Sequence, residues 1–118
     1  MLTELLALPV RYWRGLSLLS LVVLTVLSLL PLQAASSMAG SDKLLHLAAW
    51  GLAVVPAALA LGRRVVPVIG VFLMWGIAIE FVQPLVGRFF EVADMLANAV
   101  GLSLGTGLGI ALRRLAGS

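Results

Sequence analysis

The sequence has no cysteine and few charged residues, and both absences narrow the range of function. The absence of cysteine from its 118 residues excludes disulfides, thiolate metal sites, lipid attachment to cysteine and a cysteine nucleophile. Charged residues make up 11% of the chain, whereas an ordinary soluble domain has about 25%. Polar side chains are therefore too few to cover a water-facing surface.

Hydrophobic residues are unusually abundant in this chain. They make up 62% of the chain, against about 45–50% in a typical soluble domain. Composition and length together predict an integral membrane protein with a single domain over residues 1–118. The net charge of +3 does not indicate nucleic-acid binding, because the arginines stand at the ends of apolar segments, where membrane topology explains them.

Four apolar segments are long enough to cross a membrane core of about 30 Å. The predicted helices cover residues 15–32, 43–62, 65–83 and 93–112. Short connections between them favour antiparallel neighbours, so the expected fold is an all-α bundle of four transmembrane helices. The first segment exceeds the roughly 7–15 apolar residues of a signal peptide, so we interpret it as a membrane helix.

Two further local features are predicted at helix ends. Residues 1–14 mix leucines with Arg11-Tyr12-Trp13-Arg14, a combination typical of an anchor at the lipid headgroups. Ser41 or Asp42 is expected to cap the start of the second helix, because both are favoured N-cap residues.

The basic residues predict the orientation. One side of the predicted bundle carries Arg11, Arg14, Arg63, Arg64, Arg113 and Arg114, whereas the other carries only Lys43 and Arg88. By the positive-inside rule, both termini face the cytoplasm and the loops 33–42 and 84–92 face outward.

Acidic residues gather on the predicted outer side. Asp42, Glu80, Glu91 and Asp94 all belong to it, together with the single histidine, His46. Spacings of three or four residues place Asp42 with His46, Glu80 with Gln83, and Asp94 with Asn98 on shared helix faces. If these faces converge, they form one outward-facing polar pocket. Its candidate ligand-binding residues are Asp42, Lys43, His46, Glu80, Gln83, Arg88, Asp94 and Asn98.

Several chemistries are compatible with these residue types. Lys43 and Arg88 suit a phosphate-bearing headgroup, and carboxylates accept hydrogen bonds from sugars or amides. His46 beside Asp42, Glu80 or Asp94 suits acid–base catalysis in a small membrane hydrolase or transferase. Oxygen and imidazole groups also suit a cation, although we expect no bound metal or cofactor.

Structural roles are the alternative for the same residues. Asp42 could serve only as a helix cap, and Glu80 could pair with Arg88 or His46. Asp94 and Asn98 could hold helices together by hydrogen bonds. Gly101, Gly105 and Gly109 form a small-residue face that suits close packing within the bundle, or contact with a second copy or a larger partner.

The ordered set of polar motifs resembles the VanZ-like family of small bacterial membrane proteins. The motifs are Asp42-Lys43-x-x-His46, Glu80-x-x-Gln83 and Gly87-Arg88-x-x-Glu91-x-x-Asp94-x-x-x-Asn98-x-x-Gly101. The resemblance covers roughly residues 15–112. Phe89 departs from the small hydroxyl residue common in the family, and Glu91 from an aspartate.

The resemblance implies a bacterial cytoplasmic-membrane location, and the family is named for a member that confers low-level teicoplanin resistance. We therefore expect a cell-envelope protein whose outer pocket binds a lipid-linked cell-wall precursor or a glycolipid. A structural subunit that docks a larger partner is the first alternative, and an enzyme is the second. Membrane lipids are expected partners, and nucleic acids are not.

Overall fold

The computed structural model describes residues 1–29, 39–87 and 92–117, and for residues 39–42 it describes the backbone alone. Within these ranges the chain is helical and contains no strand, which confirms the predicted fold class at this level. Its elements are α1 (Leu2–Arg11), α2 (Trp13–Leu29), α3 (Ala39–Leu61), the 3₁₀ turn η2 (Gly62–Val65), α4 (Val66–Val82), the 3₁₀ turn η3 (Gln83–Val86) and α5 (Val92–Gly117).

The N-terminal segment forms a separate short helix. The axes of α1 and α2 differ by 67° across a break at Tyr12, and α1 buries none of its residues. The Arg11 and Arg14 guanidinium groups each lie 5.4 Å from the centre of an adjacent aromatic ring, that of Tyr12 and Trp13 respectively. These cation–π contacts surround the bend, which lies within the residues 1–14 that the sequence analysis set apart from the following helix.

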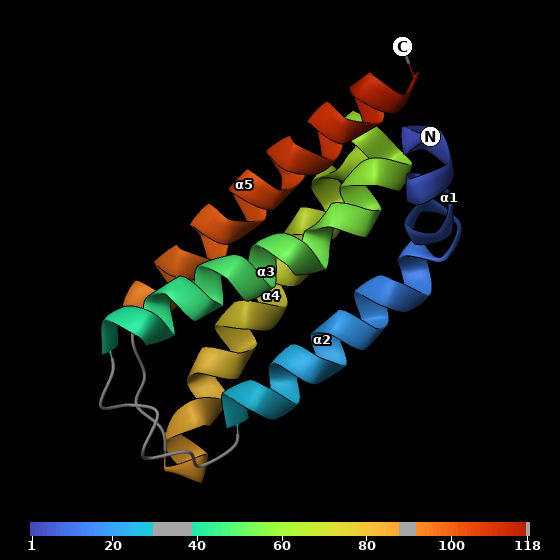
Figure 1. The fold of residues 1–118 in the computed structure, drawn as a ribbon. Coiled ribbons are helices and arrows are strands. Elements are labelled where there is room, and N and C mark those ends of the chain that lie inside the picture. The colour runs from blue at the N-terminus through green and yellow to red at the C-terminus, as the bar shows by residue number, and fades with distance from the viewer. Residues whose placement is uncertain (30–38, 88–91, 118) are drawn as a thin grey trace.

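The middle of the chain turns back at Gly62. Figure 1 shows α3 running away from the grey loops and α4 returning toward them. Gly62 has a φ of +60°, a left-handed conformation that favours glycine at the end of a helix. Arg113 Nη1 donates to the Leu59 and Ala60 carbonyl oxygens at 2.8 Å each, so an arginine of α5 satisfies the otherwise unbonded end of α3.

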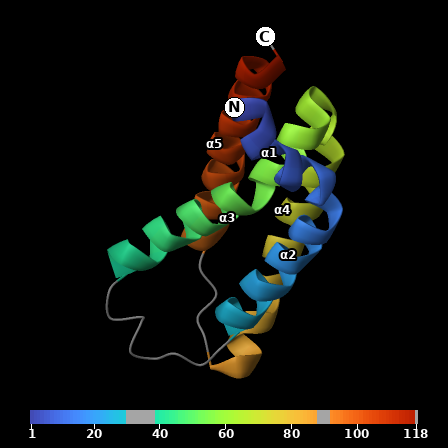
Figure 2. The same ribbon diagram turned by 45° about the vertical axis from the view of Figure 1, so that its right-hand side comes forward.

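Helix α5 packs against α3 along most of its length through glycines (Figures 1 and 2). A Cβ atom on Gly101 would collide with the Leu47 carbonyl oxygen, and one on Gly105 would collide with the Gly51 carbonyl oxygen. Gly109 is also buried there. The small-residue face is therefore used inside the bundle, one of its two expected roles.

The apolar core lies between α3 and its neighbours. The Trp50 ring meets the Phe72 ring edge-on, with centroids 6.2 Å apart, and Leu102 is fully buried beside them. On the α2 side of α4, Trp75 Nε1 donates to Thr25 Oγ1 at 2.7 Å. Most other large apolar side chains on α2, α4 and α5 face outward, which is the reverse of a water-soluble helical bundle.

The surface and lengths of the helices are compatible with a membrane protein. Within the described ranges, two helical runs are long and apolar enough to cross a membrane: Lys43–Val86, which includes the turn at Gly62, and Val92–Gly117. The bent pair α1–α2 counts as a third if it forms one span.

Helix boundaries differ from the predicted ones mainly at the start of α3 and the end of α5. The expected cap at Ser41 or Asp42 is wrong, because α3 already begins at Ala39 and both residues lie within the helix. Helix α5 continues past residue 112 to Gly117, since Arg113 and Arg114 do not interrupt it. Pro67 lies in the first turn of α4, where its missing N–H costs no helical hydrogen bond.

Candidate functional site

Three ionisable side chains from three helices meet near the loop-bearing end of the bundle. His46 comes from α3, Glu80 from α4 and Asp94 from α5, and one nitrogen or carboxylate oxygen from each lies within 4.8 Å of the other two. Figure 1 shows that α3 and α5 begin, and α4 ends, opposite the two chain termini. We call these three residues, together with Lys43, the polar cluster.

Burial makes the polar cluster unusual. Glu80 is 1% exposed and Asp94 is 3% exposed, whereas His46 is half-buried. Taking a carboxylate out of water costs several kcal/mol unless opposite charge or hydrogen bonds compensate it. Two such groups side by side are therefore maintained by the packing of three helices around them.

Helix geometry favours one carboxylate and disfavours the other. Asp94 lies in the first turn of α5, where the positive end of the helix dipole stabilises an anion. Glu80 lies in the last turn of α4, where the dipole destabilises one. Glu80 therefore needs compensation from neighbouring helices more than Asp94 does.

Lys43 joins the cluster to the surface. Its Nζ lies 2.8 Å from Asp94 Oδ1, and the side chains are 29% and 5% exposed. The contact is an ion pair without hydrogen-bond geometry at that oxygen. Lys43 precedes His46 by three residues on α3, so both face α5 and α4 from the same side of the helix. Lys43 is therefore a partly exposed member of the cluster, in contact with a buried carboxylate.

Asn98 lies one turn deeper than Asp94 on α5 and is 4% exposed. It reaches across to α4, since its Nδ2 is 3.1 Å from where a Cβ of Gly76 would stand. Its Oδ1 is buried and accepts no hydrogen bond within the described part of the chain. Asn98 thus adds a polar residue one helical turn deeper than Asp94. Its amide oxygen can still accept a hydrogen bond.

Gly76 and Trp50 shape this deeper level, and the sequence reading did not assign either to the site. A Cβ on Gly76 would lie 3.2 Å from the Trp50 ring as well as against Asn98. Trp50 is 1% exposed and belongs to the apolar core. Gly76 precedes Glu80 by four residues, and this same-face spacing is the signal that could have identified it.

Gln83 contacts α2. Its Nε2 donates to the Ser28 carbonyl oxygen at 3.0 Å, and the residue is 1% exposed. Ser28 is close to the last described residue of α2, Leu29. The hydrogen bond ties η3 to α2 and gives Gln83 a structural role at the edge of the site.

Other predicted site residues lie outside the described part of the chain. Arg88 falls in the gap between residues 87 and 92, and the side chain of Asp42 is not described. The expected pairing of Glu80 with Arg88 falls in the same gap.

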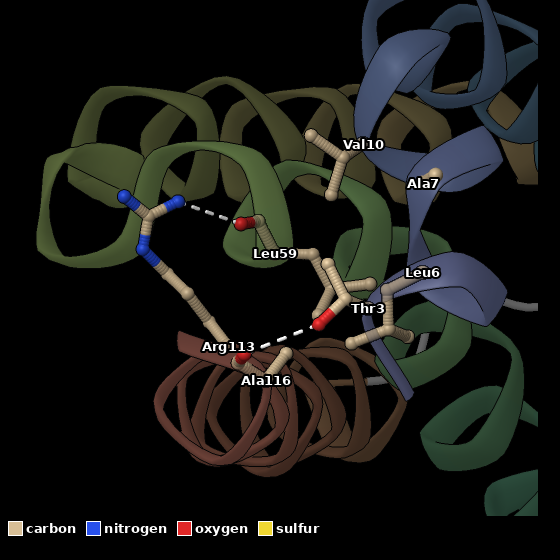
Figure 3. Close-up of a pocket in the computed structure, with 7 residues that line it drawn as sticks. All are labelled: Thr3, Leu6, Ala7, Val10, Leu59, Arg113 and Ala116. Carbon is tan, nitrogen blue, oxygen red and sulfur yellow. Dashed lines mark hydrogen bonds between the residues drawn. The ribbon is translucent and has the colours of Figure 1, made fainter. Parts of the chain in front are cut away.

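A cavity of about 200 Å³ lies at the opposite end of the bundle, next to the termini. Its lining residues are Thr3, Leu6, Ala7, Val10, Leu59, Arg113 and Ala116. Figure 3 shows the Arg113 guanidinium directed at the Leu59 carbonyl, and Thr3 Oγ1 donates to the Ala116 carbonyl oxygen at 3.2 Å. Its polar groups are engaged in helix contacts and its walls are mostly apolar, so the chemistry-bearing residues are those of the polar cluster.

The polar cluster can perform three kinds of chemistry. Its carboxylates can accept hydrogen bonds from an amine or hydroxyl group, and Lys43 can bind an anionic oxygen. His46 can exchange a proton with a group held by the carboxylates. The nitrogen and oxygen atoms can also surround a cation. Comparison of the chain with models of protein families, with curated proteins and with solved structures gave no match.

Proposed function

We propose that this chain is a multi-pass protein of the bacterial cytoplasmic membrane that binds the polar headgroup of an envelope lipid. The observation that carries the proposal is the convergence of His46, Glu80 and Asp94, with one donor atom each within 4.8 Å of the others. In lipid-exposed helices, ionisable residues are expensive and mark functional sites by default.

The proposed topology has four spans, formed by α2, α3, α4 and α5. The turn at Gly62 separates α3 from α4, so the long apolar run Lys43–Val86 is taken as two spans. The two termini lie at the same end of the bundle (Figure 1), near Arg63, Arg64 and Arg114, which are exposed. The positive-inside rule then assigns this end to the cytoplasm and the polar cluster to the outer leaflet.

A headgroup ligand agrees with the position and charge of the cluster. Headgroups of envelope lipids combine phosphate with amine, amide or sugar hydroxyl groups. Lys43 is exposed enough to meet a phosphate, and the buried carboxylates behind it can accept hydrogen bonds from amide or hydroxyl groups. The resemblance to the VanZ-like family supports a lipid-linked cell-wall precursor or a glycolipid, and extends the proposal to a link with glycopeptide resistance.

Native mass spectrometry of the detergent-purified protein tests this function. Wild type, Glu80→Gln and Asp94→Asn are compared with Glu4→Gln, which removes an exposed carboxylate near the opposite end of the bundle. We expect a lipid adduct on wild type and on Glu4→Gln, and no adduct on the two cluster variants at unchanged helicity. A bare wild-type protein, or adducts on all four proteins alike, would overturn the proposal.

A small membrane hydrolase or transferase is the second candidate, because His46 lies beside two carboxylates that can orient it. This candidate requires turnover of the bound lipid. Incubation of the purified protein with the co-purifying lipid distinguishes it: a His46-dependent product indicates an enzyme, and unchanged lipid indicates a binding protein.

A further inference from the structure

We infer that the polar cluster binds a divalent transition-metal ion through His46, Glu80 and Asp94. The inference rests on the proposed function, because it takes these residues as a ligand site. It adds a metal cation to what that site binds. It revises the expectation from sequence that the chain needs no metal.

The first support is the spacing of the donor atoms. Ligand atoms bound to zinc lie about 2.0–2.2 Å from the ion, so two of them can be at most about 4.4 Å apart. The three donor atoms here all lie within 4.8 Å of one another. Separations of up to 4.8 Å exceed that limit by no more than about 0.4 Å.

The second support is the balance of charge. Glu80 and Asp94 bring two carboxylates into a buried position, and the Lys43 ammonium nitrogen lies 2.8 Å from Asp94 Oδ1. Buried charge of one sign is costly, and a divalent ion removes that cost while it also separates the two carboxylates.

The identity of the donors selects the class of metal. Oxygen ligands alone suit magnesium, calcium or manganese, whereas an imidazole shifts preference toward zinc, copper, iron or nickel. Three protein ligands also leave a coordination position open, as in catalytic rather than structural zinc sites. A phosphate or hydroxyl oxygen of the bound headgroup is suited to that position.

The environment of the three ligands supplies an independent observation. Asn98 lies one turn below Asp94 between α5 and α4, and its buried Oδ1 accepts no hydrogen bond from any described residue. Metal sites commonly include outer groups that orient the ligands or a bound water. A metal-bound water would donate a hydrogen bond to this unpartnered amide oxygen.

Metal uptake by the chelator-treated protein tests the inference. The protein in detergent is titrated with Zn²⁺, Mn²⁺ and Co²⁺ separately, and bound metal is counted by elemental analysis after desalting. We expect about one ion per chain for wild type and for Glu4→Gln, and at least a tenfold loss of affinity in Glu80→Gln and in His46→Gln. No saturable uptake of any of the three ions, or equal uptake by the cluster variants, would overturn the inference.

A readout on wild type alone keeps the test independent of variant folding. Bound Co²⁺ absorbs visible light strongly in a four- or five-coordinate protein site, so wild type is expected to develop this absorption and to lose it when Zn²⁺ is added. A spectrum identical to that of hexahydrated Co²⁺ would contradict the inference.

The two proposals on this site can fail separately. If lipid adducts persist after complete removal of metal, headgroup binding stands, and the claim that a metal ion takes part in it is overturned. One ion per chain without any lipid adduct would support the metal and overturn headgroup binding.

Discussion

The Lys43 ammonium nitrogen lies 2.8 Å from Asp94 Oδ1, and this ion pair joins the N-terminal parts of α3 and α5 at the polar end of the bundle. Toward the other end, the same two helices are joined by Arg113, which donates to the last carbonyls of α3. Close glycine contacts fill the length between these two polar links. The bundle thus fixes the position of Asp94 before any ligand arrives.

Removal of Lys43 tests that link. In the metal-free protein, Lys43→Met leaves the Asp94 carboxylate buried without its cation, and we expect it to destabilise the fold by about 1–2 kcal/mol, discounted because the lysine is partly exposed. Lys43→Arg keeps the charge and is the control. Thermal unfolding in detergent measures both, and equal stability of Lys43→Met and wild type would exclude a stabilising ion pair.

The glycine contacts predict a sharp contrast on α5. Gly105→Ala pushes a methyl group into the Gly51 carbonyl oxygen, so we expect a loss of about 1–3 kcal/mol from overpacking. Gly107→Ala meets no atom within 4 Å and adds helix propensity, so we expect it to be neutral or stabilising by up to about 1 kcal/mol. Thermal unfolding in detergent measures both variants. If Gly105→Ala and Gly107→Ala unfold at the same temperature, α5 does not pack on α3 in this register.

A second pair of glycines tests the deeper level of the site. Gly76→Val places side-chain atoms against Asn98 and Trp50, whereas Gly70→Val, on the same helix, meets open space. We expect Gly76→Val to weaken ligand binding at least tenfold and to cost about 1–3 kcal/mol in stability. Lipid adducts and metal uptake are measured for both variants. Undiminished binding in Gly76→Val would show that the ligand site is not next to Gly76.

Arg113 and Arg114 are neighbours with different expected roles. Arg113→Gln removes a charged donor from the carbonyls of Leu59 and Ala60, and we expect a loss of about 1–2 kcal/mol. Arg114 is exposed, and Arg114→Gln should change stability by less than about 0.5 kcal/mol. Equal losses of stability in the two variants would show that net charge near the C-terminus, and not the hydrogen bonds from Arg113 to the end of α3, stabilises this region.

The sequence predicted those parts of the fold that depend on local pattern. Apolar run lengths indicated the helices, and the four-residue spacing of Gly101, Gly105 and Gly109 indicated a close-packed face. Spacing also placed His46 and Asp94 on helix faces that could converge. It could not show that they do, because the convergence depends on how α3, α4 and α5 are rotated against one another.

Contacts between distant segments account for what the sequence did not reveal. The hydrogen bond from Gln83 to the Ser28 carbonyl depends on the placement of η3 beside α2, which no local pattern encodes. Arg113 indicates membrane topology when only the sequence is considered, yet its guanidinium also caps α3. The predicted cap at Ser41 or Asp42 failed because the helical segment extends through these polar residues to Ala39.

The stability of Glu80→Gln, measured by thermal unfolding of delipidated and metal-free protein, tests most directly whether the polar cluster is a ligand site or a structural link between helices. If the cluster is a ligand site, Glu80→Gln is expected to lose binding with little change in the midpoint, because it removes one of two neighbouring carboxylate charges that repel each other. A structural network predicts the reverse. A midpoint that falls by several degrees in Glu80→Gln, together with undiminished lipid binding, would contradict the account.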